Sequence, residues 1–509
     1  MEGFLSLIIT AHVPYVRAAS RHAQGDELLH ETIAFGLIPL LNTLCDLRDA
    51  GQAAPIGIAF SPILLEQLAQ PDVSERFREW MSAWLNTRAD ALARWQRQGA
   101  DHTSYLAQFD LEWGRSILAS FDQRFHGDLI TPLRDLCADL AEPLAGAATH
   151  AYLPLLQHPA SLTAQLQVGT AAVARRLGRA PAGLWLPECG FHPRLYPAIR
   201  ASAANYLVVD SASMAPDDTT LYPRWAVPER LQVLVRDQRA AALIWSPELG
   251  YSGDPVYRST RRDPRAGMAL WRNGMGEVHE QLYDPYDAFR RAEEDAGQFL
   301  MAVAGALAHA AEQHERPGIA LVPIDLEVIG RRWFEGQTWL RSVLMRSIQG
   351  EGPGLAAPSD YLRTYHPLDL APLHEGSWGP GGDHRTWQNQ AARPIWQAIS
   401  EAEERLADLL QQQHPPGLLT THALNQALRE LLIAQSSDWS LLAGLGYLEE
   451  PLRRVRQHLE RCERLCQMVE GIVPFDQSYL QLLERIDNPF PFLHHSVFTD
   501  VTLYGYDRS

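Results

Sequence analysis

The sequence predicts an α/β protein: a parallel α/β barrel interrupted by a helical insertion and followed by an all-α domain. Short apolar runs alternate with helical stretches through the first two thirds of the chain. A long amphipathic stretch replaces this alternation at about residues 70–125, and only helical periodicity follows the Gly-rich stretch at 374–387. We therefore expect a catalytic domain over residues 1–382 and a helical domain over 383–509.

Six runs rich in Val, Ile and Leu are expected to be strands covered on both faces by helices. They are 4–10, 56–61, 183–188, 205–210, 241–246 and 319–325. A polar residue ends or closely follows each run, and parallel barrels carry their active sites at the carboxyl ends of their strands. These polar residues are His12, Ser61, Glu188, Asp210, Ser246 and Asp325.

Helical spacing accounts for the remaining long segments. In the insertion, residues 73–98 form one expected helix, and its spaced tryptophans (Trp80, Trp84, Trp95) are interpreted as core residues. After the Gly-rich stretch, apolar spacing and Pro/Gly breaks predict a bundle that includes helices at 394–413, 423–435 and 451–471.

Composition restricts the class of partner. The chain has 509 residues, 46% hydrophobic content and a formal net charge of -17. This acidic balance, without a basic run, argues against nucleic acid and anionic membranes but leaves a neutral sugar polymer open. Residues 4–9 lack a basic leader, and no stretch approaches the roughly 18–20 apolar residues of a membrane span. We expect a cytoplasmic protein.

The five cysteines are too few and too scattered for a disulfide framework. Cys462 and Cys466 lie four residues apart on an expected helix. Half of a metal site is one interpretation of this spacing. Two buried thiols are the favoured one, because the chain has no second cysteine pair.

Two carboxylates at the ends of separate strands supply the candidate chemistry. Glu188 lies in "GLWLPECGF" and Asp325 in "VPIDLEVIGRRWFEG". Cleavage of a glycosidic bond needs one acid to protonate the leaving oxygen and a second to attack or stabilise the sugar cation. Aromatic rings suit the apolar faces of sugars, and several lie close to the two acids in the sequence. These are Trp185, Phe191, Trp333, Phe334 and Trp339.

Further polar candidates could contact a sugar. His12 in "AHVPYVR" and His150 in "ATHAYLPLL" could each donate a hydrogen bond to a hydroxyl group, or could simply cap loops. "IWSPELGYSG" offers Trp245, Glu248 and Tyr251, and "SSDWSLL" offers Asp438 and Trp439.

A metal site is the rival interpretation of these polar residues. It would be built from His12, His150, Asp210 and Asp325. Without H-x-H, H-E-x-x-H or a paired-Cys motif it is disfavoured. Esterase, phosphotransferase and dehydrogenase functions are disfavoured as well, because G-x-S-x-G, Walker and G-x-G-x-x-G loops are missing after the strands.

At these residues the chain resembles glycoside hydrolase family 57, and within it the 1,4-α-glucan branching enzyme group. "AHVPYVR" and "ATHAYLPLL" resemble the first two family motifs, "GLWLPECGF" the third and "PIDLEVIGRRWFEG" the fourth. "EGSWGPGGDHRTW", "SSDW" and "DNPFP" resemble further stretches of the branching enzymes. Each motif is weak alone, but the ordered set, running nearly end to end, is specific.

The resemblance implies a (β/α)7 barrel with the insertion and C-terminal domain already predicted. It makes Glu188 the nucleophile of a retaining mechanism and Asp325 the general acid/base, with carboxyl groups roughly 5–5.5 Å apart. The substrate is an α-glucan, and neither a metal nor an organic cofactor is implied. The glucan-lining positions of the family correspond here to His12, Trp245, Trp378 and Asp438.

The chain departs from the family pattern in three places. Thr10 replaces the first His of the usual His-x-His-x-Pro-Tyr motif, and Arg331, Arg332 and Trp333 replace a His-Trp-Trp-like run. A cation close to Asp325 should lower the pKa of that carboxyl. The third departure is the short segment from Asp210 to Trp245.

In branching enzymes this last segment carries an aromatic-tipped loop that covers the site. Exclusion of water favours transfer over hydrolysis, so a short cover should raise the hydrolytic share. Tyr222 and Trp225 are candidates to replace the missing aromatic cover.

Three functions follow from this reasoning. The first is a branching enzyme that cuts α-1,4 links and rejoins the fragment through α-1,6 links. The second is an α-amylase-like hydrolase or a 4-α-glucanotransferase. The third is a glucan-binding protein with weak or lost activity, which the presence of both acids disfavours.

Overall fold

A barrel of parallel strands forms the centre of the molecule. The computed structural model describes residues 3–16, 25–215, 220–227, 231–246, 250–274, 281–367, 369–412 and 417–499. In these residues the parallel strands follow the order β7-β5-β4-β3-β2-β1-β8. Their bounds are β1 (Phe4–Ala11), β2 (Ile56–Phe60), β3 (Ala141–Ala145), β4 (Gly183–Trp185), β5 (Tyr206–Val209), β7 (Leu231–Val235) and β8 (Ile319–Asp325).

The barrel closes through a narrow contact between β7 and β8, the strands at the two ends of this order. Arg236, just past β7, forms a single parallel bridge with Leu321 of β8, and Asp237 N donates to Leu321 O at 2.8 Å. The expected (β/α)7 barrel is therefore confirmed, with one weakly joined seam. Three short strands extend the sheet outside the barrel: β6 (Arg224–Val227), β9 (Gly354–Leu355) and β10 (Leu370–Pro372).

Five of the six predicted strands are confirmed, and the prediction at 241–246 is wrong. That segment belongs to the helix α9 (Gln238–Trp245). The carboxylate of Asp237 accepts hydrogen bonds from Arg239 N and Ala240 N, which caps the helix. The strand of this unit is β7, directly before the cap. The sequence reasoning also missed β3, whose run "AEPLA" contains a Glu and a Pro.

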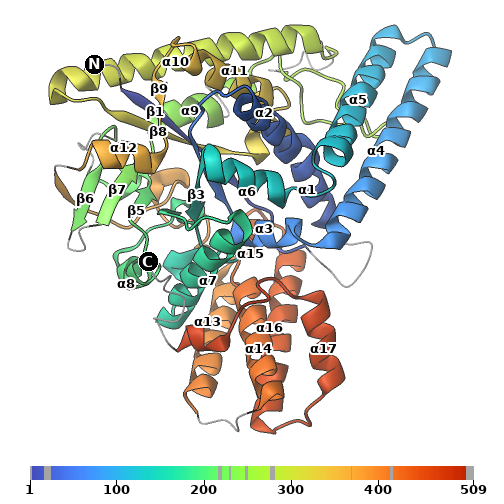
Figure 1. The fold of residues 1–509 in the computed structure, drawn as a ribbon. Coiled ribbons are helices and arrows are strands. Elements are labelled where there is room, and N and C mark those ends of the chain that lie inside the picture. Colours follow the sequence, from blue (N-terminus) through green and yellow to red (C-terminus); the bar gives the residue numbers. More distant parts are fainter. Residues whose placement is uncertain are drawn as a thin grey trace.

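Helices cover the outside of the barrel (Figure 1). They are α1 (Gly25–Glu31), α2 (Ile38–Asp49), α3 (Pro62–Leu68), α6 (Ile130–Asp139), α7 (Pro159–Leu177), α8 (Tyr196–Ala201), α9, α10 (Pro285–His314), α11 (Gly336–Ile348) and α12 (Pro358–Thr364). The described part of the chain also contains three π-helical turns: η1 (Thr32–Leu37), η2 (Ser120–Arg124) and η8 (Glu327–Arg332). Short 3-10 turns complete the set: η3 (Leu153–Leu155), η4 (Pro187–Cys189), η5 (Pro193–Leu195), η6 (Ser211–Ser213), η7 (Tyr251–Gly253), η9 (Pro380–Gly382) and η10 (His495–Phe498).

One helical run is more apolar than the sequence reasoning allowed. Residues Asp26–Asp49, which span α1, η1 and α2, are long and apolar enough to cross a membrane. The expectation that no stretch reaches this limit is therefore wrong. In the structure 78% of the apolar window is buried, and Ile33, Leu37 and Leu41 belong to the main core. Packing against the barrel accounts for the composition of this run.

The insertion is a long helical hairpin made of α4 (Pro71–Arg97) and α5 (Asp101–Ala119). It projects from one side of the barrel (Figure 1). Trp84 and Trp95 are each 9% exposed, and Trp80 packs against the same core. The interpretation of these tryptophans as core residues is confirmed.

The C-terminal helices form a bundle on a second core. They are α13 (Arg393–Gln411), α14 (Leu418–Ala434), α15 (Ser437–Gly444), α16 (Glu449–Glu470) and α17 (Gln477–Ile486). Their core contains the buried Cys462 and Cys466, as expected, and also Ala164 and Val168 of α7. The bundle is therefore packed directly onto the barrel (Figure 1).

A glycine at the start of β4 leaves room for a buried tyrosine ring, and this gives a stability prediction. A Cβ at Gly183 would overlap the ring of Tyr206, which is 1% exposed and whose hydroxyl donates to Glu142 at 2.7 Å. We expect Gly183→Ala to lower the free energy of unfolding by about 1–3 kcal/mol, because the ring cannot move away. Chemical denaturation measures this change.

Gly305→Ala is the matched control. Gly305 is exposed on α10, and an added Cβ there meets nothing within 4 Å. Alanine should raise stability by about 0.5–1 kcal/mol at this position. Equal stability of Gly183→Ala and the wild type would show that Tyr206 does not close over β4 as described.

Candidate active site

The two predicted acids both lie at the carboxyl ends of barrel strands. Asp325 is the last residue of β8, in register with Thr10 of β1. Glu188 follows β4 in the turn η4 and has φ 60° and ψ 20°. Its neighbour Cys189 also has a positive φ, of 49°. Left-handed backbone is costly for residues other than glycine and gathers at functional sites, where the surroundings hold it in place.

The Gly-rich stretch holds the Glu188 turn. Gly376 and Phe191 exchange backbone hydrogen bonds at 2.8 and 3.0 Å, and Trp378 N donates to the carbonyl of Glu188 at 3.1 Å. The indole Nε1 of Trp378 then donates to Glu188 Oε2 at 2.7 Å. Two segments nearly 190 residues apart in the sequence therefore fix both the backbone and the carboxylate of Glu188.

Three tryptophans meet beside this carboxylate, but they differ in exposure. The Trp378 ring lies 5.4 Å from the ring of Trp185 and 5.4 Å from that of Trp245. Trp245 and Trp378 are partly exposed and line a cavity of about 1090 Å³. Trp185 is only 4% exposed. Its ring packs edge-to-face against the ring of Trp378 and is too buried to offer a face for sugar contact.

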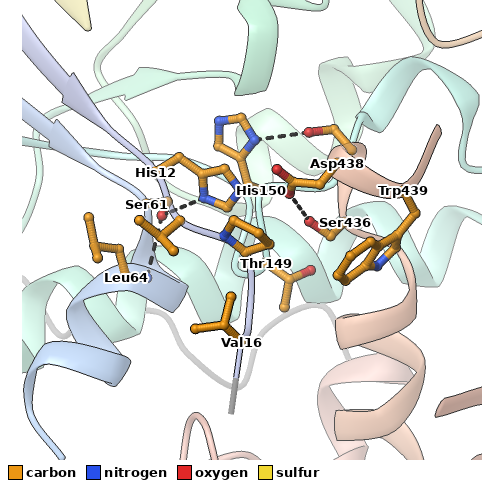
Figure 2. A network of polar contacts seen from close by, with 12 residues as sticks. His12, Val16, Ser61, Leu64, Thr149, His150, Ser436, Asp438 and Trp439 are labelled. Carbon is orange, nitrogen blue, oxygen red and sulfur yellow. Dashed lines mark hydrogen bonds and ion pairs between the residues drawn. The ribbon is translucent and has the colours of Figure 1, made fainter. Parts of the chain in front are cut away.

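A histidine–aspartate network joins the barrel to the helical bundle (Figure 2). His12, just past β1, bonds Asp438 Oδ2 through Nε2 at 2.7 Å and Ser61 Oγ through Nδ1 at 2.9 Å. Asp438 belongs to α15, and Ser436 Oγ also donates to its carboxylate. Burial would raise the pKa of Asp438, but His12 and these hydrogen bonds hold it well below its usual range. Asp438 is therefore a stable anion.

His150 completes this cluster. Its ring stacks on the ring of His12 with centroids 3.9 Å apart, and its Nδ1 lies 3.0 Å from Ser437 Oγ and 3.9 Å from Glu188 Oε1. Like Glu188, it has a left-handed backbone, with φ 58°. Burial, and then the adjacent His12, lower the pKa of His150 well below its usual value. His150 is therefore neutral and can share hydrogen bonds with a hydroxyl group.

The electrostatics of the two acids favour general acid/base chemistry near neutral pH. Burial raises the pKa of Glu188 to about 7, and the charges of Asp438 and Asp325 add to this effect. The Trp378 N–H opposes it. Burial likewise raises the pKa of Asp325 to about 7, assisted by the charge of Glu327. Because the charge of Asp325 raises the pKa of Glu188, one proton between the two carboxyls is the favoured state.

Arg332 lowers the pKa of Asp325, as expected of a nearby cation, but burial outweighs this effect. Arg331 and Arg332 both pair with Glu327, whose single negative charge offsets one of their two positive charges. Thr10, which replaces a family histidine, is 5% exposed and donates to Ile324 O at 3.4 Å, beside Asp325.

Several aromatic candidates lie elsewhere than predicted. Three of the rings are completely buried because they pack in the main core: Phe191, Trp333 and Trp339. Tyr222 donates its hydroxyl to Arg316 O, and Trp225 donates Nε1 to Pro367 O. These two are held in other parts of the fold and do not replace a cover over the acids. Sequence position near the acids did not reveal which rings face inward.

The remaining candidates have these positions. Trp439 is 4% exposed, Tyr251 is half-buried, and Phe334 is half-buried and lines a different pocket. Glu248 lies outside the described residues. The rival metal set does not assemble, because Asp210 bonds Arg236 Nε at 2.6 Å and both nitrogens of His12 are already bonded.

The sequence reasoning missed three contributors: Ser437, Arg236 and Gly376. Ser437 holds His150, the buried Arg236–Asp210 pair lies under Trp378, and Gly376 clamps the Glu188 turn. Ser437 lies within the "SSDW" motif and Gly376 within the Gly-rich stretch, and these were the available signals. No local pattern marks Arg236, because its role arises from contacts between distant segments.

Fold and site together define the class: an α/β-barrel enzyme with the carboxylate pair of a glycosidase. A model described as "Glycosyl hydrolase family 57" matches residues 6–374, and one described as "1,4-alpha-glucan branching enzyme, C-terminal" matches residues 398–498. The chain belongs to glycosyl hydrolase family 57.

Individual relatives agree with this assignment. The 1,4-alpha-glucan branching enzyme of Thermococcus kodakarensis is 31% identical over 96% of this chain and 78% of its own. A crystal structure of the branching enzyme from that archaeon, in complex with glucose and additives, has a TM-score of 0.91 at 30% identity and covers 98% of this chain and 96% of its own. The alpha-amylase AmyC of Thermotoga maritima has a TM-score of 0.86 at 25% identity, covering 98% and 99%.

The hydrogen bond between His12 of the barrel and Asp438 of the helical bundle gives a prediction about stability. Asp438→Asn keeps the shape of the side chain but removes the charge that pairs with His12. We expect the free energy of unfolding at pH 7 to fall by about 1.5–3 kcal/mol, the usual contribution of a hydrogen bond to a charged group. Urea unfolding measures the difference.

Asp408→Asn serves as control, since Asp408 is an exposed residue of α13. That change should leave stability within about 0.5 kcal/mol of the wild type. Identical unfolding curves for Asp438→Asn and Asp408→Asn would mean that the His12–Asp438 bond does not hold the domains together.

Proposed function

We propose that this protein is a 1,4-α-glucan branching enzyme that acts through Glu188 and Asp325. It cleaves an α-1,4 link and rejoins the freed chain through an α-1,6 link. The observation that carries the proposal is the pair of partly buried carboxyls at one barrel mouth, of which Glu188 receives the indole N–H of Trp378. The similarity of the C-terminal domain to that of branching enzymes supports the transfer step.

In the first step Asp325 acts as the acid. Its pKa of about 7 keeps a proton on the carboxyl at neutral pH, ready for the leaving glycosidic oxygen. Glu188 attacks the anomeric carbon as a carboxylate, and the hydrogen bond from Trp378 stabilises that ionised form. The α-1,4 C–O bond breaks, a glycosyl ester forms on Glu188, and the shortened chain leaves with the proton.

In the second step the acceptor is a 6-hydroxyl group of a glucan. Asp325, now ionised, removes the hydroxyl proton while the oxygen attacks the anomeric carbon and releases Glu188. Two inversions give net retention. Trp245 and Trp378 offer apolar faces for glucose rings along the cavity, and neutral His150 shares hydrogen bonds with a hydroxyl.

Hydrolysis is the second candidate, and one observation favours it. Tyr222 and Trp225, in the short segment after Asp210, are held away from the site. Water would then compete with the glucan hydroxyl for the glycosyl ester. The similarity to the Thermotoga maritima alpha-amylase is in line with this alternative.

One assay separates these functions. Amylose is incubated with the protein, and iodine staining, reducing ends and α-1,6 links after debranching are followed. Branching raises α-1,6 links while reducing ends stay constant, whereas hydrolysis raises reducing ends. Glucan binding with no change in any of the three signals would support only the binding protein.

The role of Glu188 is tested by Glu188→Gln, which is nearly isosteric and can still accept the Trp378 hydrogen bond. An amide cannot form the glycosyl ester, so the rate on amylose should fall by at least about 10⁴-fold with the unfolding curve preserved. Glu142→Gln is the control, because Glu142 lies in β3 and is buried beside Tyr206 and Ser359. Substantial activity in Glu188→Gln would assign the nucleophile to another residue.

The Trp378 hydrogen bond predicts a shift in pH dependence. Glu188 must be ionised to attack, so activity falls when the pH drops below its pKa. Trp378→Phe removes the N–H that lowers this pKa. The acid limb of kcat/KM should therefore move to higher pH, by about one pH unit.

Trp245→Phe is the control for this shift. Trp245 lines the same cavity, but its Nε1 donates to Pro323 O and not to Glu188. The variant should change KM and leave the acid limb in place. Equal pH limbs in the two variants would show that the indole bond does not tune Glu188.

We infer a cytoplasmic location as part of the same proposal. All five cysteines are free and buried in the structure, as suits a reducing compartment. Cell fractionation tests this point, and recovery from the medium or an oxidising compartment would contradict it.

A further inference from the structure

A second, smaller cavity lies between the barrel and the insertion. It measures about 490 Å³ and lies between α1, the α4–α5 hairpin, the loop at 258–269 and the end of η8. Five guanidinium groups line it: Arg88, Arg258, Arg262, Arg331 and Arg332. Neither catalytic acid nor any of their hydrogen-bond partners is among its lining residues in the described ranges. The proposed glucan chemistry does not account for this cavity.

The side chain of Arg88 carries an unpaired donor in this cavity. Arg88 is 7% exposed, yet its Nε has no hydrogen-bond partner. The nearest carboxylate oxygen, Asp110 Oδ2, is 3.9 Å away, because Arg258 already binds Asp110 with both Nη atoms at 2.9 and 3.0 Å. A buried N–H of a charged group without an acceptor is costly. The Arg88 guanidinium therefore offers an unused donor to the cavity.

The cavity also has surplus positive charge. Three carboxylates face its five guanidinium groups: Asp110, Glu31 and Glu327. Glu335 is completely buried beside Arg258, whose backbone N–H donates to it. Even with Glu335 counted, four carboxylates face five guanidinium groups, in a protein whose net charge is -17. An anion fits this surplus of positive charge.

Aromatic rings hold two of the arginines in place before any ligand arrives. The guanidinium of Arg88 lies 3.7 Å from the centre of the Trp84 ring, and that of Arg258 lies 5.0 Å from the ring of Phe334. Arg88 Nη2 also donates to Gly267 O at 3.1 Å. Such stacked and tethered groups lose little freedom on binding.

The size and lining of the cavity indicate more than a bare ion. A volume of about 490 Å³ lies in the range of small-molecule sites and exceeds the need of a single phosphate. Ser259 and Thr260 add hydroxyl groups, and Phe35 adds an apolar ring. This mixture of donors and flat apolar surface suits a sugar attached to the phosphate.

We propose that this cavity binds a small phosphorylated sugar, with the phosphate held by Arg88 and the surplus guanidinium groups beside it. Guanidinium forks match the oxygens of a phosphate dianion, and Arg88 Nε would gain its missing acceptor. The proposal does not depend on the reaction at Glu188 and Asp325. It also gives a role to Arg331 and Arg332, which depart from the family motif.

Isothermal titration calorimetry on the full chain at low ionic strength tests the site. Glucose 6-phosphate, inorganic phosphate and neutral glucose are the three probes. We expect saturable binding of about one glucose 6-phosphate per chain, weaker binding of phosphate, and no competition from glucose. Affinity should fall as salt rises, because the contact is ionic. Equal affinity for both phosphate probes would overturn the sugar part of the proposal.

Two variants and one control locate the binding. Arg88→Met should weaken binding of glucose 6-phosphate by at least about tenfold, and Arg332→Gln by about threefold to tenfold. The Arg332 side chain is 66% exposed, so that variant tests the site even where Arg88→Met folds poorly. Arg363→Gln, on the exposed α12 with a side chain 76% exposed, should bind like the wild type.

The outcomes are distinct. Absence of saturable binding by both phosphate probes, or unchanged affinity in Arg332→Gln together with a folded Arg88→Met, would overturn the proposal. Competition by neutral glucose or maltose would reassign the cavity to glucan binding. Neither result would affect the assays on Glu188, because those follow bond cleavage and not this equilibrium.

Discussion

Partial burial of two carboxyl groups in one barrel mouth is the constraint on which the site depends. Reduced contact with water raises the pKa of both Glu188 and Asp325 to about 7, which costs stability at neutral pH but provides a proton donor and a nucleophile together. Two contacts determine which acid keeps the proton. The Trp378 N–H stabilises the ionised form of Glu188, and the charge of Glu327 favours the protonated form of Asp325. Backbone strain at Glu188 is the other cost of this arrangement.

The helical bundle is part of the site and not an attachment to it. Asp438, on α15, supplies the charge that orients His12 (Figure 2), and Ser437 orients His150. His150 in turn lies 3.9 Å from the carboxylate of Glu188. The shared core of the bundle and α7 fixes these side chains at the mouth. A barrel without the bundle would therefore lack the partners of both histidines, even with both acids in place.

The sequence predicted those features that local patterns control. Apolar runs that end in a polar residue located β1, β2, β4, β5 and β8, and with them Glu188 and Asp325. It failed at 241–246, where an apolar run is a helix because Asp237 caps it. Nearness to the acids in the sequence selected Trp333 and Trp339, which fill the core, whereas the family resemblance pointed to Trp378, which lines the cavity. Exposure depends on packing between distant segments, and one sequence does not display that.

The arginines after Asp325 show why charge must be located before its effect is assigned. Arg331 and Arg332 lie six and seven residues from Asp325, and sequence distance alone predicts a lower pKa for that carboxyl. In the structure both guanidinium groups pair with Glu327, and Arg331 also approaches Glu31 at 3.8 Å across the second cavity. Glu327 remains bonded to Asp325 through its backbone N–H at 2.7 Å. The two ends of the turn η8 therefore act at different sites. Glu327, its first residue, bonds the catalytic acid Asp325, whereas Arg331 and Arg332, its last residues, add positive charge to the cavity beside the insertion.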